Sequence, residues 1–329
     1  MDILVYKPPI TEKQLTRLKR FLSDLGLWWD EEIETFIILE EGREIIATGA
    51  RQRNLLKCIG VAPIHQGEGH VATLISELVK DALRAGYTHL FIFTKPSSSP
   101  IFQSLGFYEI AATDSAALLE NRRNGIADFV KGIKQPHQND DIGCVVANCN
   151  PFTNGHSYLI EQAASRCGLL YLFILSEDRS MFSTVERMGM AKAGTAHVSN
   201  VMVVPTSDYI ISSATFPDYF MKDRTLSTDI NTELDLIIFV KKIALPLGIA
   251  KRFVGTEPLC QVTHAYNEQM KRILPKHGIG VEEMQRYEVN NQIVSASIVR
   301  KLLCERKLDE IRQMVPHTTY QILEKKVRD

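Results

Sequence analysis

The spacing of hydrophobic positions predicts alternating strands and helices in the second half of this chain. A continuous apolar run at 142–147 is typical of a strand buried on both faces of a parallel sheet. After it, apolar side chains recur at helical spacing at Leu159, Ile160, Ala163 and Ala164. Further strands are expected at 169–175, 200–204, 252–255 and 281–289, and further helices from Ser183 and at 234–245 and 264–274. This order predicts a doubly wound, Rossmann-like parallel sheet.

The first half has a different pattern, with short alternating strands and fewer helices. It is expected to open with an amphipathic helix at 14–25, followed by hairpin strands at 34–39 and 44–51. A strand at 55–61, a helix at 71–85 and a strand at 89–93 come next. A polar stretch with a proline at 134–141 separates the halves, so we predict an α+β domain at 1–136 and an α/β domain at 141–329.

Composition narrows the possible functions. The 329 residues carry a net charge of −1, which argues against a general nucleic-acid or anionic-membrane binder, so any anion site must be local. No apolar run of about 18 residues and no signal-peptide pattern is present, and we expect a cytoplasmic protein without a membrane partner. The six cysteines form no C-x-x-C pair, which favours reduced, mostly buried thiols.

The loop after the strand at 142–147 is the strongest candidate for chemistry. It precedes a helix, whose free N–H groups and macrodipole attract phosphate. Gly155 lets a phosphate approach the backbone, and His156 can donate to an oxygen that gains charge. We expect nucleotide contacts from Asn148, Cys149, Asn150, Pro151, Phe152, Thr153, Asn154, Gly155 and His156. An ordinary Pro-Gly loop is the alternative, and Cys149 is either a packing residue or a reactive thiol.

A second helix start, at 294–300, has the same character. Ser295 or Ser297 can cap that helix, and Arg300 lies one turn inside it, within reach of a β- or γ-phosphate. The T-x-G-H of 153–156 and this V-S-A-S-I-V-R segment resemble the two signatures of the nucleotidylyltransferase superfamily, H-x-G-H and I-S-S-T-x-x-R. Thr153 replaces the first His, as it does in phosphopantetheine adenylyltransferases.

The first half resembles the GNAT family of N-acetyltransferases. In that fold a Q/R-x-x-G-x-G/A loop offers N–H groups to the pyrophosphate of coenzyme A. Gln66, Gly67 and Gly69 match the pattern, whereas Val71 stands where the family has Gly or Ala. The segment 101–107, ending in Gly-Phe, is similar to a later helix and strand entry of the fold. The resemblance implies a GNAT-like domain and a possible site for a coenzyme A-like arm, but not by itself an activity.

The fusion of these two domains resembles the citrate lyase ligases, and segments 208–220, 254–258 and 290–300 are similar to that family. The resemblance implies that acetate attacks the α-phosphate of ATP, with Mg²⁺ held by phosphates and water. The acetyl group then passes to the thiol of the phosphoribosyl-dephospho-coenzyme A group on the citrate lyase acyl carrier subunit. Thr153 and His156 would steady the α-phosphate, and Arg300, Ser295 and Ser297 the pyrophosphate.

Other polar residues at strand ends are weaker candidates. Gly255, Thr256 and Glu257 follow a buried strand and are expected near the nucleotide, with Glu257 near the ribose. The polar loop of Ser212, Ser213 and Thr215 is a candidate contact for acetate or adenylate, or only a capping turn. Lys222 and Arg224 reach phosphate or form a solvated face.

Three other functions remain open at this point. A phosphopantetheine adenylyltransferase-like enzyme would use the same loops without acetate. A GNAT N-acetyltransferase with a nucleotide-binding domain would bind acetyl-coenzyme A at Gln66, Gly67 and Gly69, which Val71 disfavours. A non-catalytic assembly factor would not need His156 and Arg300.

Overall fold

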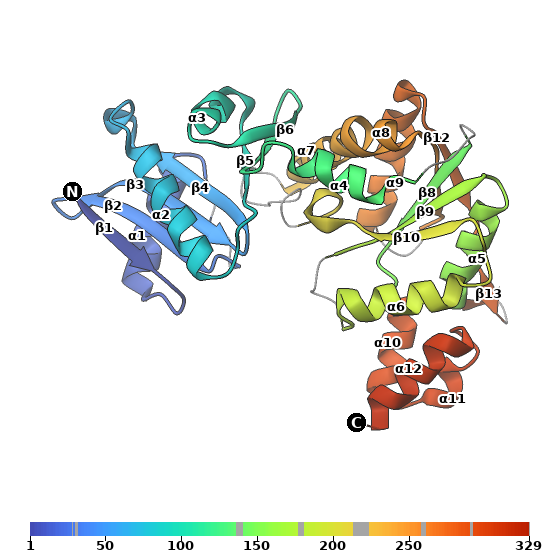
Figure 1. Cartoon of the computed structure of the whole chain (residues 1–329). Helices are drawn as coiled ribbons and strands as arrows, with labels where there is room; N and C mark the ends of the chain where they lie inside the picture. The colour runs from blue at the N-terminus through green and yellow to red at the C-terminus, as the bar shows by residue number, and fades with distance from the viewer. Residues whose placement is uncertain are drawn as a thin grey trace. The chain divides into compact units, whose positions relative to one another are not determined.

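The computed structural model describes residues 1–27, 29, 32–135, 141–176, 181–212, 224–257, 261–289 and 292–328. The chain divides into two compact units (Figure 1). The first contains Met1–Asp128 and helix α7 (Arg224–Ile238), and the second contains Phe129–Ser212 and Phe239–Asp329. The domain limits at 136 and 141 stay predictions, because residues 136–140 lie outside the described part.

The described part of the first unit contains a seven-stranded mixed sheet in the order β1-β2-β3-β4-β5-β7-β6, in which β4 and β5 are parallel and the other neighbours antiparallel. Its strands are β1 (Asp2–Tyr6), β2 (Thr35–Glu41), β3 (Glu44–Gln52), β4 (Leu55–Val61), β5 (Phe91–Thr94), β6 (Tyr108–Ala112) and β7 (Ala117–Glu120). Its helices include α1 (Glu12–Asp24), η1 (Pro63–His65), α2 (His70–Arg84), η2 (Pro96–Ser98) and α3 (Ser99–Ser104). Helix α4 (Gly125–Ile133) follows.

Strand β2 shows how the two faces of this sheet are covered. Successive side chains of a strand point to opposite faces. Phe36 and Ile38 pack with Leu18 of α1, whereas Ile37 and Leu39 belong to the cluster that contains α2. The two helices therefore bury opposite faces of one sheet, and the unit has the GNAT-like α+β fold expected from the sequence.

The expectation that this unit opens with a helix is wrong. Strand β1 precedes α1 and pairs with β2 at the edge of the sheet. Ile3 and Val5 remain 44% and 52% exposed, so the strand buries little and lacks the pattern of a core element. Its position is set by pairing with residues 30 to 38 positions away, which a local pattern cannot reveal.

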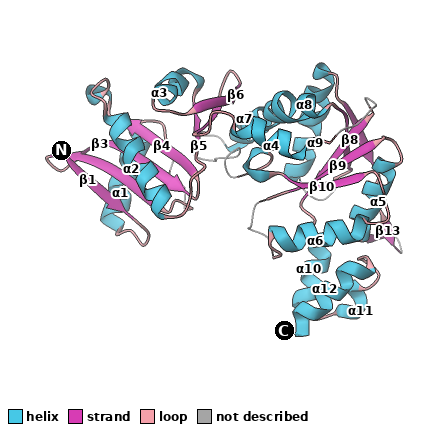
Figure 2. Ribbon diagram, in the orientation of Figure 1, coloured by secondary structure: helices cyan, strands magenta, loops and turns pink. Residues whose placement is uncertain are grey.

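The second unit is built on a five-stranded parallel sheet in the order β10-β9-β8-β11-β12 (Figure 2). The strands are β8 (Ile142–Ala147), β9 (Leu169–Ile174), β10 (Val201–Pro205), β11 (Ile249–Gly255) and β12 (Gly280–Met284). The chain moves outward from β8 to one side and then returns to its other side with β11. The crevice between β8 and β11, at the carboxyl ends of the strands, is therefore the topological switch point where such sheets bind ligands.

Helices cover both faces of this sheet. Phe253 of β11 packs in the core cluster with α5 and α6, while its neighbour Arg252 faces Phe239 on the other side. The helices are α5 (Asn154–Ala164), α6 (Thr184–Thr195), η3 (Ser207–Tyr209), the π-helix η5 (Phe239–Ala244), α8 (Leu245–Leu247), α9 (Gln261–Ile273), η6 (Leu274–His277), α10 (Ala296–Cys304), α11 (Leu308–Ile311) and α12 (His317–Arg328). No helix in the described ranges is long and apolar enough to cross a bilayer.

Two element predictions in this half need correction. The helix expected at 234–245 ends as an α-helix at Ile238, and η5 continues it with the wider turn that buries Phe239, Val240 and Ile243 together. The strand expected at 281–289 ends at Met284. Residues 288–289 form β13 (Glu288–Val289), which pairs with β14 (Gln292–Ile293) in a separate hairpin.

Helix α6 allows a test of the packing around Phe152, which lies in the loop between β8 and α5. A Cβ added at Gly194 would meet the Phe152 ring at 2.4 Å, whereas one at Gly189 meets nothing within 4 Å. Gly194→Ala should lower the free energy of unfolding by about 1–2 kcal/mol, because overpacking outweighs the gain in helix propensity. The matched Gly189→Ala should raise it by up to about 1 kcal/mol. Urea unfolding of both variants would measure this; equal stabilisation would contradict the packing.

Candidate active site

A cavity of about 510 Å³ lies at the switch point of the second unit. Its walls come from the ends of β8 and β11, the starts of α5 and α10, and helix α9. Of the residues expected to bind nucleotide, Asn148, Thr153, Gly155, His156, Gly255, Glu257, Ser295 and Ser297 line it. The structure thus brings together segments that are separated by about 140 positions in the sequence.

A capping box at the start of α5 fixes His156. Thr153 is the N-cap, and its backbone N–H donates to Nδ1 of His156 over 3.0 Å. The Thr153 hydroxyl lies 2.8 Å from the same Nδ1 and accepts from the His156 N–H at 3.4 Å. Since a backbone N–H can only donate, Nδ1 must be unprotonated, and a neutral ring carries its proton on Nε2. Thr153 therefore orients the imidazole as a hydrogen-bond donor.

The environment keeps this imidazole neutral. Burial in the cavity wall and the positive charge of Arg286 lower the pKa of His156 to about 4. The Phe152 ring stacks against the imidazole with centroids 5.7 Å apart. His156 can thus donate from Nε2 to an oxygen that gains negative charge, without first having to lose a proton.

Gly155 lies where the start of α5 approaches the segment before α10. A Cβ at this position would lie 3.2 Å from the backbone oxygen of Val294 and 3.5 Å from Oγ1 of Thr153. Glycine therefore allows the segment before α10 to approach the first turn of α5. This close approach places the Ser295 cap beside His156 in the cavity wall.

Helix α10 is capped by Ser295, as expected from the sequence, and Arg300 connects this helix to the loop after β8 by a hydrogen bond. Ser295 Oγ accepts the N–H of Ser297 at 3.2 Å. Arg300 donates to the backbone oxygen of Asn150 at 2.5 Å and to Ser297 Oγ at 3.0 Å. Two of its five N–H groups are used in this way. Its contact with phosphate stays a prediction, while its contact with the loop is a structural feature.

Several loop residues point into the protein instead of the cavity. Phe152 and Cys149 are fully buried in the core cluster. Burial raises the pKa of the Cys149 thiol to about 12, so the thiol stays protonated and acts as a packing residue. Asn150 accepts the Phe182 N–H at 3.3 Å through its side chain. Asn154 donates to the backbone oxygens of Met314 and Gln313 at 2.9 and 3.0 Å.

A buried arginine that was not anticipated holds this loop in place. Arg187 of α6 donates through Nη1 to the backbone and side-chain oxygens of Asn148, at 3.1 and 2.8 Å. It also donates to the backbone oxygens of Leu175 and Phe182, at 2.5 and 3.0 Å. Arg187 therefore connects the loop after β8, the end of β9 and the start of α6. The capping box of Ser183 and Glu186 was the sequence signal next to it.

The end of β11 forms the opposite wall. Asn267 of α9 donates to the Gly255 oxygen at 3.2 Å. Arg286 donates to the Thr256 oxygen at 2.6 Å and forms an ion pair with Glu257. Arg286 follows β12, a parallel strand, and that position was a usable signal that the sequence reasoning missed. Glu257 lines the cavity as expected, but its carboxylate is engaged by Arg286.

Ser212 is the described residue of the candidate acetate loop, and it does not line this cavity. Ser212 is buried and donates to the Asp208 oxygen at 2.7 Å, while Ser213, Thr215 and Lys222 lie outside the described residues and the side chain of Arg224 is likewise not described. Pro151 is buried. The five described cysteines are free thiols, four of them buried, as expected.

Gln66, Gly67 and Gly69 belong to the first unit. Gly67 and Gly69 adopt φ of +88° and +81°, and Gly69 is the N-cap of α2. The side chain of Gln66 donates to the Val61 oxygen at 3.3 Å. Val71 packs partly against the core cluster of this unit, and its effect on a phosphate at this loop stays a prediction.

Comparison with known proteins identifies the family. Residues 142–323, which include the whole cavity wall, match the model for the citrate lyase ligase C-terminal domain. The chain is 41% identical to the citrate (pro-3S)-lyase ligase of Haemophilus influenzae over 324 residues, covering 95% of this chain and 96% of the relative. The chain belongs to the citrate lyase ligase family.

Other relatives agree with this assignment. Identity to the citrate (pro-3S)-lyase ligase of Klebsiella pneumoniae is 40% over 314 residues, 93% of this chain and 91% of that protein. A phosphopantetheine adenylyltransferase of Aliivibrio fischeri is 34% identical over 98 residues, 29% of this chain and 61% of that protein. The similarity to the citrate lyase ligases thus extends over both units, whereas the similarity to the phosphopantetheine adenylyltransferase covers 29% of this chain.

The state of His156 can be tested by its titration. The folded pKa of about 4 lies below the ordinary value of 6.5, so between these values the unfolded chain binds a proton that the folded chain does not. The contribution of His156 to stability is therefore complete above pH 6.5 and is lost as pH falls toward 4. Imidazole ¹⁵N NMR should show the neutral Nε2–H tautomer from about pH 5 to about pH 8. An Nδ1–H tautomer, or titration near the ordinary value, would contradict the capping-box geometry.

Proposed function

We propose that this protein is an ATP-dependent acid–thiol ligase that adenylates acetate and acetylates the citrate lyase acyl carrier subunit. A carboxylate oxygen of acetate attacks the α-phosphorus, and the bond to pyrophosphate breaks. The thiol of the carrier's phosphoribosyl-dephospho-coenzyme A group then attacks the acetyl carbon, releases AMP and loses its proton. Membership in the citrate lyase ligase family supports this proposal.

The neutral, oriented His156 carries the proposal for the first step. Acetate is already a nucleophile, so the site has to position the reactants and stabilise charge without supplying a base. Nε2 of His156 donates to the α-phosphate, and Thr153 holds the ring in place. Ser295, Ser297 and the spare donors of Arg300 receive the departing pyrophosphate at the start of α10.

Mg²⁺ enters this scheme with ATP. Among the described residues that line the cavity, Glu257 is the single carboxylate, and it is paired with Arg286. The donor set therefore suits an ion that is held mainly by phosphates and water. The ion would neutralise the triphosphate, while Arg286 adds fixed positive charge to the wall.

Arg252 supplies a place for the acetate carboxylate. It lines the cavity and is 2% exposed, yet its Nε and Nη1 have no hydrogen-bond partner among the described residues. Its guanidinium lies 4.6 Å from the Phe239 ring centre, and burial raises the pKa of the neighbouring Cys144 to about 11, so that thiol is neutral. A buried cation of this kind favours an anionic ligand. Arg252 thus binds acetate next to the nucleotide.

The first unit binds the coenzyme A-like arm of the carrier in this scheme. The loop of Gln66, Gly67 and Gly69 leads into the N-terminus of α2, a site type that attracts pyrophosphate. Partial packing of Val71 against the core cluster is compatible with an approach of pyrophosphate to the loop backbone. The alternative, a phosphopantetheine adenylyltransferase-like enzyme, would release pyrophosphate without acetate.

An ATP–pyrophosphate exchange assay tests the central step. Exchange should require acetate, and His156→Ala should slow it by roughly two to three orders of magnitude, the usual cost of losing a charge-stabilising donor. ATP affinity should fall less, because the donor acts most strongly on the transition state. The control is His197→Ala, which removes an exposed histidine paired with Glu161 and should keep full activity. Exchange that proceeds without acetate would overturn the ligase assignment.

The acetate site is tested by Arg252→Met, which keeps the apolar volume and removes the charge. The KM for acetate should rise about 10- to 100-fold, the effect of about 1.4–2.7 kcal/mol of lost binding, while the KM for ATP changes little. Thermal stability should not fall, since a buried charge with two unsatisfied donor nitrogens among the described residues disappears. Arg166→Met, at an exposed ion pair with Glu282, is the control. An equal rise in both KM values would show that Arg252 does not hold acetate.

A further inference from the structure

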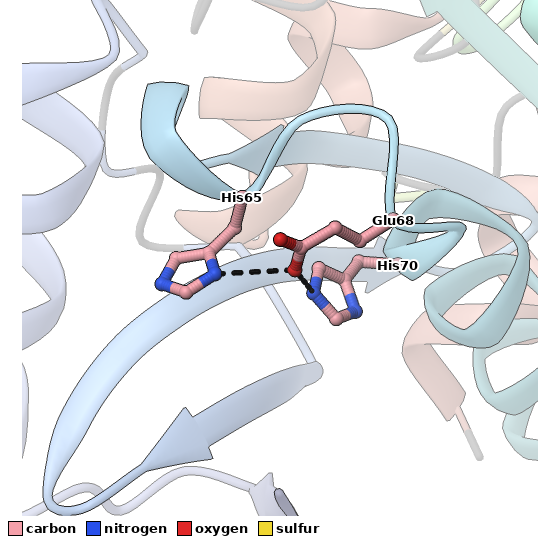
Figure 3. A group of neighbouring side chains, drawn as sticks. All are labelled: His65, Glu68 and His70. Atoms are coloured by element: carbon pink, nitrogen blue, oxygen red, sulfur yellow. Dashed lines mark hydrogen bonds and ion pairs between the residues drawn. The ribbon is translucent and has the colours of Figure 1, made fainter.

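A second cluster of ligand-type side chains belongs to the first unit and shares no residue with the cavity of the second unit. His65, Glu68 and His70 surround one point at the entry of α2 (Figure 3). His65 ends η1, Glu68 lies in the loop between two glycines, and His70 is the first residue of α2. The left-handed backbone of Gly67 and Gly69 turns the chain tightly, so that three residues within a span of six present their side chains together.

The donor atoms are already spaced as ligands of one ion. Oε2 of Glu68 lies 3.2 Å from Nδ1 of His65 and 3.0 Å from Nε2 of His70, and all three atoms lie within 4.8 Å of one another. A tetrahedral zinc site, with metal–ligand distances of about 2.0–2.1 Å, separates its ligand atoms by roughly 3.3 Å. Small rotations of the two rings would complete this geometry, because both already point to the same carboxylate oxygen.

We propose that His65, Glu68 and His70 bind a divalent transition-metal ion of the zinc class. Each neutral ring faces the ion with an unprotonated nitrogen, Nδ1 of His65 and Nε2 of His70, and carries its single proton on the nitrogen that points away. Two imidazoles and one carboxylate form a common set for Zn²⁺ with an open position for water. Two nitrogen donors select against Mg²⁺, so the ion that accompanies ATP does not compete for this site.

The exposure of the three side chains fits a site with one open side. The side chains of His65 and His70 are 22% and 12% exposed, so protein surrounds the rings, whereas that of Glu68 is 53% exposed. An ordinary surface His–Glu pair is also present in this chain: His197 lies 3.0 Å from Glu161, with 59% and 44% exposure. Within the described residues, His65, Glu68 and His70 form the group of at least three such ligands that converges on one point.

Co²⁺ titration of the full-length chain, freed of metal by a chelator, tests the proposal. Co²⁺ serves as a spectroscopic probe for Zn²⁺, and a tetrahedral site gives intense visible bands. We expect one Co²⁺ per chain, displaced by Zn²⁺ and not by Mg²⁺. His70→Gln, His65→Gln and Glu68→Gln should each weaken binding by at least about tenfold, which is the lower limit seen for loss of an outer-shell partner.

Two variants control for adventitious binding. His197→Gln removes the surface His–Glu pair, and Cys304→Ser removes the exposed thiol; both should leave the Co²⁺ spectrum and affinity unchanged. Circular dichroism should show that all variants remain folded. Weak octahedral bands in the parent protein, or equal affinity in the parent and His70→Gln, would overturn the proposal.

Discussion

The hydrogen bond from the Thr153 backbone to Nδ1 of His156 is the interaction on which the active site depends. It makes one side chain both a helix cap and the proposed donor to the α-phosphate, because the ring that accepts through Nδ1 must present Nε2–H elsewhere. Thr153 therefore fixes the orientation of the His156 ring through its backbone N–H. The Thr153 side chain contacts His156 and adds no aromatic ring to the cavity wall.

Around this bond, the chain uses backbone contacts to hold distant segments together. The missing side chain of Gly155 allows the backbone oxygen of Val294 to lie close to it. Arg300 donates a hydrogen bond to the backbone oxygen of Asn150. Arg187 donates to the backbone oxygens of Asn148, Leu175 and Phe182. These arginines donate to carbonyl groups, so their positions depend on loop shape. A substitution that moves the loop after β8 therefore changes the proposed phosphate site, even when the side chains proposed to bind phosphate are unchanged.

Much of this fold follows from sequence because local signals and the final packing agree. Strand β8, the helix that follows it, the helix starts at Ser183 and Ser295, and the alternation of strands and helices from β8 to β12 were predicted from apolar spacing and capping residues. Edge strand β1 was missed because it buries little. Arg252 and Arg286 were also missed, since each gains its role from residues far away in sequence. Spacing shows which face a residue occupies, but it does not show which cavity that face will border.

The contact between Asn154 and the segment before α12 has a consequence for how the protein is made. Asn154 donates to Gln313, 159 residues further along the chain. The loop after β8, the proposed nucleotide site, therefore lacks this contact until residue 313 has been translated. Strand pairing can begin early, but contacts of such sequence separation form late. All five strands of the parallel sheet are thus translated before this contact can form.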